Sequence, residues 1–326
     1  EGHSWISSRQ VLESYLTDPV LIDMLFCPLM FYGNAREGDM DFYQFVVMFK
    51  SIFMEGFAKP VGGMPYILHL MLDKYKDLGG EIRMGAEVES IDIESGSVRS
   101  VTLAGGEKVA SRRIISSAGY VETLRLCCPQ PEMESQPEIG RMSFMEMLFV
   151  LDCQPRELGY DKSIVFYCTE PSFKYGVPDG LTDVTSGVLC CPNNFNYPEP
   201  QEGMIRLTNQ ASFELWDGLS RKDYIAAKKE RRTMGVEAVL KFFPDFRENV
   251  VFLDAFTPKT IYKYTGHLNG AVYGSPDKTK DGRTPVENLF ICGTDQGFLG
   301  IIGATLSGIS MANLHVLQAD LSRTEA

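Results

Sequence analysis

The amino-acid sequence predicts a mixed fold in which an α/β part and an α+β part share one chain of 326 residues. Residues 86–118 have the pattern of a β-meander that runs into an apolar strand. Residues 144–256 alternate strand patterns with one long helix, and residues 288–321 form a strand, a glycine-rich loop and a helix. Antiparallel strands with a long helix are typical of α+β folds, whereas a strand leading directly into a helix is typical of α/β folds.

The first part of the chain predicts helices. Helical spacing of apolar residues covers 10–16 and 20–30, and a longer, largely apolar helix covers 40–57. A turn at Gly62-Gly63 leads into a further helix, which we expect to end at Gly79-Gly80 because glycine commonly terminates helices.

The meander is predicted from alternation and from its turns. Residues 86–94 alternate apolar and polar side chains, Ser95-Gly96-Ser97 makes a turn, and residues 98–103 return. Gly105-Gly106 makes a second turn before residues 109–118, which end in a buried strand at Ile114-Ile115.

A second sheet is predicted from about residue 132 onward. The long helix over 221–243 carries a charged face and ends before Pro244, which cannot continue it. Five strands are expected, over 144–152, 163–169, 185–191, 204–212 and 249–256.

Charge and composition exclude several functional classes. A formal net charge of −12 argues against a nucleic-acid partner, which needs a basic footprint, and gives no support to docking on anionic lipid. No apolar run is long enough to span a bilayer, so we expect at most peripheral contact with a membrane. The eight cysteines form no CxxC pair and predict buried, reduced thiols in a cytoplasmic protein, and the four histidines are too dispersed for a metal site.

The most informative segment is the glycine-rich block from Asn288 to Gly308. An apolar strand runs into Gly293, and Gly297, Gly300 and Gly303 punctuate the start of a helix. Such glycines let the backbone approach a flat ligand, and the free N–H groups of the helix start favour electron-rich oxygens. An equally good interpretation is a tight strand–helix joint without any ligand.

The usual phosphate-binding turns are missing from the sequence. Neither GxGxxG nor GxxxxGK[ST] occurs, so the first strand–turn–helix unit of a Rossmann fold is not found.

Four blocks together resemble the flavoproteins that include phytoene desaturases, carotenoid isomerases and retinol saturases, over residues 59–320. The blocks are Gly62-Gly63-Met64 with the helix to Gly79-Gly80; Gly85 to Val88 with the hairpin and Ile114 to Ala118; Thr257 to Gly274; and the glycine-rich block.

The resemblance implies an incomplete FAD-binding, Rossmann-like domain interleaved with an antiparallel-sheet substrate domain that carries helices. Residues 1–58 would be a helical part of the substrate domain, and residues 129–270 would form its sheet and long helix. The FAD domain would take residues 59–128 and 271–326.

The resemblance also implies places around FAD. The backbone of Val88 would lie near the adenine, Ser117 and Ala118 near the ribose and pyrophosphate, and Asp295 near the pyrophosphate or ribitol. Strand core explains Val88 and Ala118 equally well, and a turn or cap explains Asp295. The remaining cofactor residues implied are Gly293 and Thr294 in the same turn, Gly300, Ile301, Ile302 and Gly303 at the flavin ring, and Gly62, Gly63 and Met64 on its other side.

The implied activity is that of an FAD-dependent oxidoreductase, a desaturase, saturase or isomerase acting on C–C double bonds of an apolar isoprenoid or lipid-like substrate. The chain would act as a fragment or as one subunit, with the missing N-terminal FAD half supplied by a partner. No catalytic side chain stands out: His267, Tyr264 and Tyr273 precede the glycine-rich block, but a structural role suits each of them better.

Two alternatives stay open at this point. A flavin amine oxidase would need an aromatic pair facing the flavin, which the sequence does not place. A non-catalytic binder of lipids or prenylated proteins, of the GDP-dissociation-inhibitor type, would share the broad architecture without redox chemistry.

Overall fold

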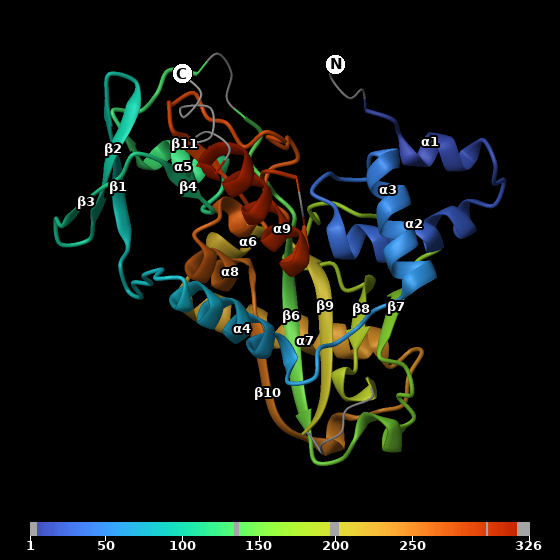
Figure 1. Ribbon diagram of the computed structural model, residues 1–326. Helices are drawn as coiled ribbons and strands as arrows, with labels where there is room; N and C mark the ends of the chain where they lie inside the picture. Colours follow the sequence, from blue (N-terminus) through green and yellow to red (C-terminus); the bar gives the residue numbers. More distant parts are fainter. Residues whose placement is uncertain (1–4, 134–136, 196–201, 298, 318–326) are drawn as a thin grey trace. The chain divides into compact units, whose positions relative to one another are not determined.

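The computed structural model describes residues 5–133, 137–195, 202–297 and 299–317 (Figure 1). The chain divides into two compact units, each built from two separate stretches. Unit 1 comprises Glu1–Ile82 and Ser143–Lys259, and unit 2 comprises Arg83–Met142 and Thr260–Ala326. The assignment of substrate or FAD roles to the predicted segments stays a prediction, because the units are defined by packing and not by function.

Unit 1 begins with helices, as predicted. Helix α1 covers Ser8–Glu13, α2 covers Pro19–Gly33, α3 covers Phe42–Phe49 and α4 covers Gly63–Asp77. Side chains accept hydrogen bonds from backbone N–H groups at three of these starts, which satisfies donors that the helices cannot pair internally. The long helix predicted over 40–57 is confirmed, but its second half is not an α-helix. Lys50–Glu55 forms a π-helix before the chain turns at Gly56.

The predicted antiparallel sheet of unit 1 is confirmed. Its strand order is β10-β6-β9-β8-β7, and all pairs are antiparallel. The strands are β6 (Ser143–Leu151), β7 (Ile164–Cys168), β8 (Ser186–Cys190), β9 (Gly203–Ala211) and β10 (Val250–Phe256).

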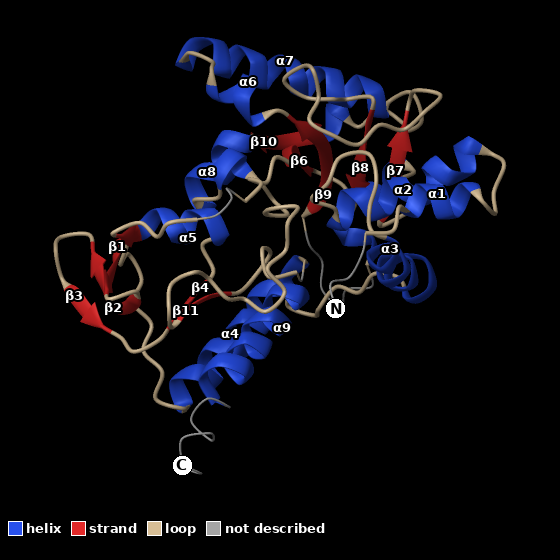
Figure 2. Cartoon of the chain, turned by 90° about the horizontal axis from the view of Figure 1, so that it is seen from above, coloured by secondary structure: helices blue, strands red, loops and turns tan. Residues whose placement is uncertain are grey.

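One face of this sheet forms the main core of unit 1. Met145, Met147 and Phe149 of β6 pack with Val236 and Val239 of α7, which covers Arg221–Val239. The short helix α6 (Phe213–Asp217) precedes α7, and Figure 2 shows α7 on one side of the sheet and α2 on the other.

Unit 2 contains the predicted meander. The sheet has the order β3-β2-β1-β5, with β1 over Val88–Glu94, β2 over Ser97–Leu103, β3 over Lys108–Ala110 and β5 over Cys127–Cys128. The expected strand over 109–118 does not stay in this sheet: it divides, and its second half becomes β4 (Ile114–Ser116) in a separate pair.

The separate pair is the part of unit 2 that resembles an α/β fold. Strand β4 runs parallel to β11 (Leu289–Ile291), and each is followed by a helix, α5 (Tyr120–Leu126) after β4 and α9 (Gly300–Ala312) after β11. Parallel pairing of segments 175 residues apart unites the two stretches of the unit. Helix α8 (Pro258–Thr265) spans the boundary between the units along the chain.

The expectation that no segment could span a bilayer is wrong on length. Helix α9 continues as a π-helix over Asn313–Leu317, so Gly300–Leu317 is an apolar helix of 18 residues with a mean hydropathy of 1.4. Core helices of soluble proteins meet the same criteria, so this single helix is weak evidence for a membrane span.

Candidate flavin site

The two parallel strands of unit 2 end at one edge of their pair. Ser116 of β4 lies opposite Ile291 of β11, so the turns that follow the two strands leave from the same edge. In open α/β sheets, ligands bind outside the carboxyl ends of the strands, where such turns meet. The turns contain five of the thirteen predicted site residues: Ser117 and Ala118 after β4, and Gly293, Thr294 and Asp295 after β11.

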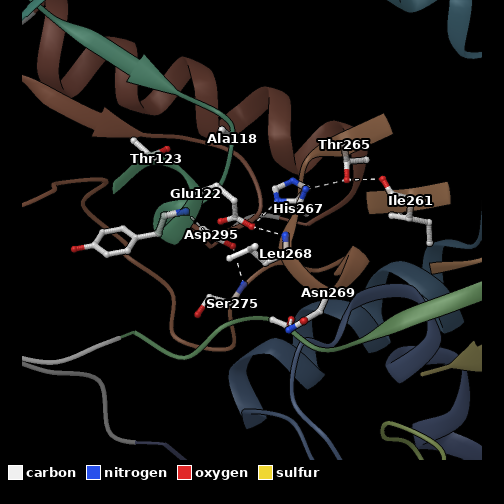
Figure 3. Close-up of polar contacts among 12 residues, drawn as sticks. Ala118, Glu122, Thr123, Ile261, Thr265, His267, Leu268, Asn269, Ser275 and Asp295 are labelled. Carbon is white, nitrogen blue, oxygen red and sulfur yellow. Dashed lines mark hydrogen bonds and ion pairs between the residues drawn. The ribbon is translucent and has the colours of Figure 1, made fainter. Parts of the chain in front are cut away.

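Asp295 holds these turns together. Its side chain is buried, with 3% exposed, and Oδ2 accepts a hydrogen bond from the backbone N–H of Tyr120 at 2.7 Å. Oδ1 accepts from the backbone N–H of Ser275 at 2.8 Å (Figure 3). Asp295 therefore caps the start of α5 from a distant part of the sequence, which is the turn-and-cap role considered above. Its predicted contact with FAD stays a prediction.

Lys278 donates hydrogen bonds to the backbone of the same turn. Its Nζ donates hydrogen bonds to the carbonyl oxygens of Tyr273, at 2.7 Å, and Thr294, at 2.9 Å. The ammonium group thus places a positive charge beside the turn after β11, where it would favour an anionic ligand. Sequence reasoning missed Lys278 because a lysine in a polar loop gives no signal of the backbone carbonyls that it will contact.

Glu122 and His267 form a second link across the site. Oε1 of Glu122 accepts from the backbone N–H of Leu268 at 2.7 Å and lies 3.7 Å from Nδ1 of His267 (Figure 3). Interaction with Glu122 raises the pKa of His267, although burial acts against it. Burial would raise the pKa of Glu122, but the bonds from His267 and Leu268 outweigh it and lower that pKa.

This pair leaves room only for glycine at the turn after β4. A Cβ added to Gly119 would lie 2.4 Å from Oε2 of Glu122 and 3.2 Å from Nδ1 of His267. Gly119 also has a φ of +103°, a conformation that L side chains rarely adopt. Sequence reasoning favoured a structural role for His267 and missed Glu122, although an acidic residue in the first turn of a helix is a usable signal.

The start of α9 is open. Leu299 precedes the helix in an extended conformation, and no side chain among the described residues caps the first N–H groups. Cβ atoms added at Gly293 or Gly300 would meet nothing within 4 Å. Ile301 and Ile302 are 47% and 63% exposed, so an apolar surface adjoins these polar N–H groups. Open space, free donors and an apolar wall fit a flavin ring with a polar pyrimidine edge.

The other predicted residues are only partly brought together. Val88 packs on the same core as Ile114, Tyr120 and Leu289, so it shares unit 2 with the turns. Gly303 lies within the first turn of α9. Gly62, Gly63 and Met64 belong to unit 1, at the start of α4, and their place beside the flavin stays a prediction.

The two tyrosines considered with His267 lie in different surroundings. The side chain of Tyr264, on α8, is 77% exposed. The backbone carbonyl oxygen of Tyr273 accepts the hydrogen bond from Lys278. Neither observation indicates a catalytic role for a tyrosine side chain.

Comparison with known proteins identifies the family. Residues 6–314 match the family described as flavin containing amine oxidoreductase. The chain belongs to this family. The match covers both units, and the FAD cofactor that the resemblance implied is confirmed by this family of flavin-containing enzymes.

Curated relatives of this family member are isomerases and reductases. The chain is 27% identical to the chloroplastic prolycopene isomerase of Daucus carota, over 82% of the chain and 45% of the relative. It is 24% identical to the all-trans-retinol 13,14-reductase of Danio rerio, over 90% of the chain and 55% of the relative. The chain thus spans about half the length of these relatives, and the resemblance inferred from the four blocks is confirmed.

Solved structures share the fold at low identity. An oxidoreductase from Methanosarcina mazei superposes with a TM-score of 0.61 at 17% identity, covering 95% of this chain and 69% of that one. The cyclohexylamine oxidase of Brevibacterium oxydans gives 0.56 at 13% identity, covering 98% of this chain and 68% of that one. These similarities show that the mixed fold is that of known oxidoreductases.

Proposed function

We propose that this chain provides the C-terminal part of the flavin site and the substrate domain of an FAD-dependent oxidoreductase. The proposed reaction is desaturation, saturation or isomerisation at C–C double bonds of an apolar, isoprenoid or lipid-like substrate. The observation that carries the proposal is the open start of α9 beside the carboxyl ends of β4 and β11.

The relatives support this class of substrate. Two of them are named for prolycopene and for all-trans-retinol, which are both isoprenoid polyenes. An apolar polyene offers few groups for acid–base catalysis, so the cofactor would supply the electron transfer while the protein orients the chain and excludes water. The lack of an evident catalytic side chain in the sequence agrees with that division of roles.

The chain's own residues would hold FAD in three ways. The first N–H groups of α9 would donate to the pyrimidine oxygens of the flavin, and Ile301 or Ile302 would pack beside the ring. Lys278 would add positive charge near the phosphates, acting through the turn at Thr294. Glu122 and Asp295 would fix the turn after β4 without touching the cofactor.

A partner segment is proposed to complete the site. Ile302, Leu306 and Ile309 recur at helical spacing on α9 and are 63%, 47% and 53% exposed. An apolar stripe of this kind is usually covered by protein or lipid. A strand–turn–helix unit with the GxGxxG pattern would cover it and supply the missing pyrophosphate contacts. We propose a cytoplasmic location for the complete enzyme, in association with a membrane if lipid covers this stripe.

Amine oxidation is the second candidate, because the family is described by amine oxidoreductases. The test is to purify the full gene product, record its visible spectrum and incubate it separately with a carotenoid polyene and with primary amines. Flavin absorbance together with isomerised, oxidised or saturated polyene supports the proposal, whereas hydrogen peroxide from amines supports the second candidate. A colourless protein that ignores added FAD contradicts both and favours a non-catalytic binder.

A further inference from the structure

The sheet face of unit 1 that points away from α7 carries the ion pair of Glu146 and Arg206 among largely apolar side chains. At the sheet edge Asp254 of β10 lies opposite Leu148 and is paired with Lys228. Glu146 of β6 lies opposite Thr208, and Arg206 of β9 lies opposite Leu148, so all four side chains share this face. The alternate residues Met145 and Met147 form the core with α7 on the other face. Neighbours on the ion-pair face include Val188 and Cys190 of β8 and Ile164 and Phe166 of β7.

The two charges are unequally exposed. The side chain of Glu146 is 10% exposed, whereas that of Arg206 is 41% exposed. Nε and Nη2 of Arg206 both contact Oε1 of Glu146. Oε2 of Glu146 has only the Thr208 hydroxyl, at 3.5 Å, among the described residues. One carboxylate oxygen and the outer edge of the guanidinium therefore keep hydrogen-bonding capacity.

The ion pair of Glu146 and Arg206 is not needed to stabilise the sheet. Strands β6 and β9 are already paired over their full lengths, from Ser143 opposite Ala211 to Leu151 opposite Gly203. Burying an ion pair costs desolvation energy, and apolar residues of similar size often stabilise a fold as well or better. A ligand with complementary groups is a better reason for charges on an apolar face.

Aromatic side chains lie on the same sheet face as the ion pair of Glu146 and Arg206. Tyr32, at the end of α2, packs against Phe166 at a ring distance of 5.4 Å and against Phe57 at 5.0 Å. Phe166 lies opposite Val188 of β8, which in turn lies opposite Thr208, so Tyr32 packs on the same face as the pair. Burial raises the pKa of Tyr32. The surroundings thus suit an apolar molecule with one polar group.

We propose that Arg206 and Glu146 recognise a hydroxyl end group on the apolar substrate. A hydroxyl can accept from the guanidinium and donate to Oε2 of Glu146, so it satisfies both members of the pair. It carries no charge, whereas a carboxylate would be repelled by Glu146 at short range. This assignment rests on the proposed function, because it takes the face as part of the substrate domain.

The test compares three matched C20 polyenes that end in a hydroxyl, a carboxylate or a methyl group. Their binding to the full, flavin-loaded protein is measured by quenching of protein fluorescence. We expect the hydroxyl polyene to bind at least about tenfold more tightly than the methyl polyene, since it bonds to charged groups. The double variant Glu146→Gln/Arg206→Met removes the pair without leaving an isolated buried charge.

The double variant should bind the hydroxyl polyene no better than the methyl polyene while keeping the wild-type affinity for the latter. The control Asp245→Asn/Arg247→Gln removes an exposed ion pair of the same unit and should keep the tenfold preference. If the double variant does not fold, Glu146→Gln alone should still reduce the preference, because the amide is a weaker acceptor than the carboxylate.

Three results would overturn the assignment. These are equal affinity of the wild-type protein for the hydroxyl and methyl polyenes, tighter binding of the carboxylate polyene, and an unchanged preference in the double variant. A protein that binds flavin and all polyenes without discrimination leaves the proposed function standing. A protein that binds neither flavin nor any polyene refutes the proposed function as well.

Discussion

Replacing Gly293 by alanine should weaken FAD binding through a single methyl group. Gly293 has a φ of +87°, and Gly106, in the turn between β2 and β3, has a φ of +86°. An added Cβ meets nothing within 4 Å at either position. The two alanine variants should therefore share the cost of the left-handed conformation, about 1–2 kcal/mol in the free energy of unfolding.

Gly293 and Gly106 differ in their surroundings. Gly293 is buried at the carboxyl end of β11, where we place the cofactor, whereas Gly106 faces solvent. A methyl group that intrudes on a well-packed ligand costs about 1–3 kcal/mol. Since about 1.4 kcal/mol is a factor of ten, the dissociation constant of FAD should rise by about 5- to 150-fold for Gly293→Ala only.

The assay is a titration of FAD by quenching of flavin fluorescence, with urea unfolding of the flavin-free protein as the measure of strain. Wild-type affinity in Gly106→Ala and weakened affinity in Gly293→Ala are expected, with similar unfolding midpoints for both variants. Equal loss of FAD affinity in the two variants would show that backbone strain alone is responsible. Wild-type affinity in Gly293→Ala would show that the cofactor does not approach this turn.

The remaining predictions concern the residues that hold the site together. Asp295→Ala should lower the free energy of unfolding by about 2–5 kcal/mol, because it leaves the buried N–H of Ser275 and the partly buried N–H of Tyr120 without an acceptor. Asp295→Asn should lower it less, and equal urea midpoints for the two variants would contradict this. Glu122→Gln should destabilise the protein most between pH 4.5 and 6.5, since folding lowers the pKa of Glu122 from 4.5 and raises that of His267 from 6.5. The contribution of the pair to stability falls as the pH drops through the lowered pKa of Glu122 or rises through the raised pKa of His267. Equal destabilisation at about pH 5.5 and about pH 9 would refute the charge pairing. Lys278→Met should lower stability by about 1–3 kcal/mol and weaken FAD binding more in low salt than in high salt, and a salt-independent loss would point to packing alone.

The sequence was sufficient for elements whose pattern is local. Alternation and two glycine turns located β1 and β2, and helical spacing located α2, α4 and α7 within a few residues of their ends. The glycine-rich block also located the junction between β11 and α9, because glycine is needed where the backbone has a positive φ, as at Gly293 and Gly300.

Contacts between distant segments could not be predicted in the same way. The parallel pairing of β4 with β11 depends on three residues from each strand, and nothing in Ile114 to Ser116 specifies a partner 175 residues away. Asp295 illustrates the same limit for the site. The resemblance implied a cofactor contact for Asp295, with a turn or cap as the alternative. The partners of its cap, the backbone N–H groups of Tyr120 and Ser275, are brought near only by the folded chain.

A crystal structure of the full protein with FAD is the most direct test of the central claim, that the start of α9 binds the flavin ring. We expect the pyrimidine edge of the flavin within hydrogen-bonding distance of the first free N–H groups of α9, near Gly300 to Ile302, with Gly293 facing the cofactor. A flavin bound elsewhere, with those N–H groups capped by protein, would contradict the account.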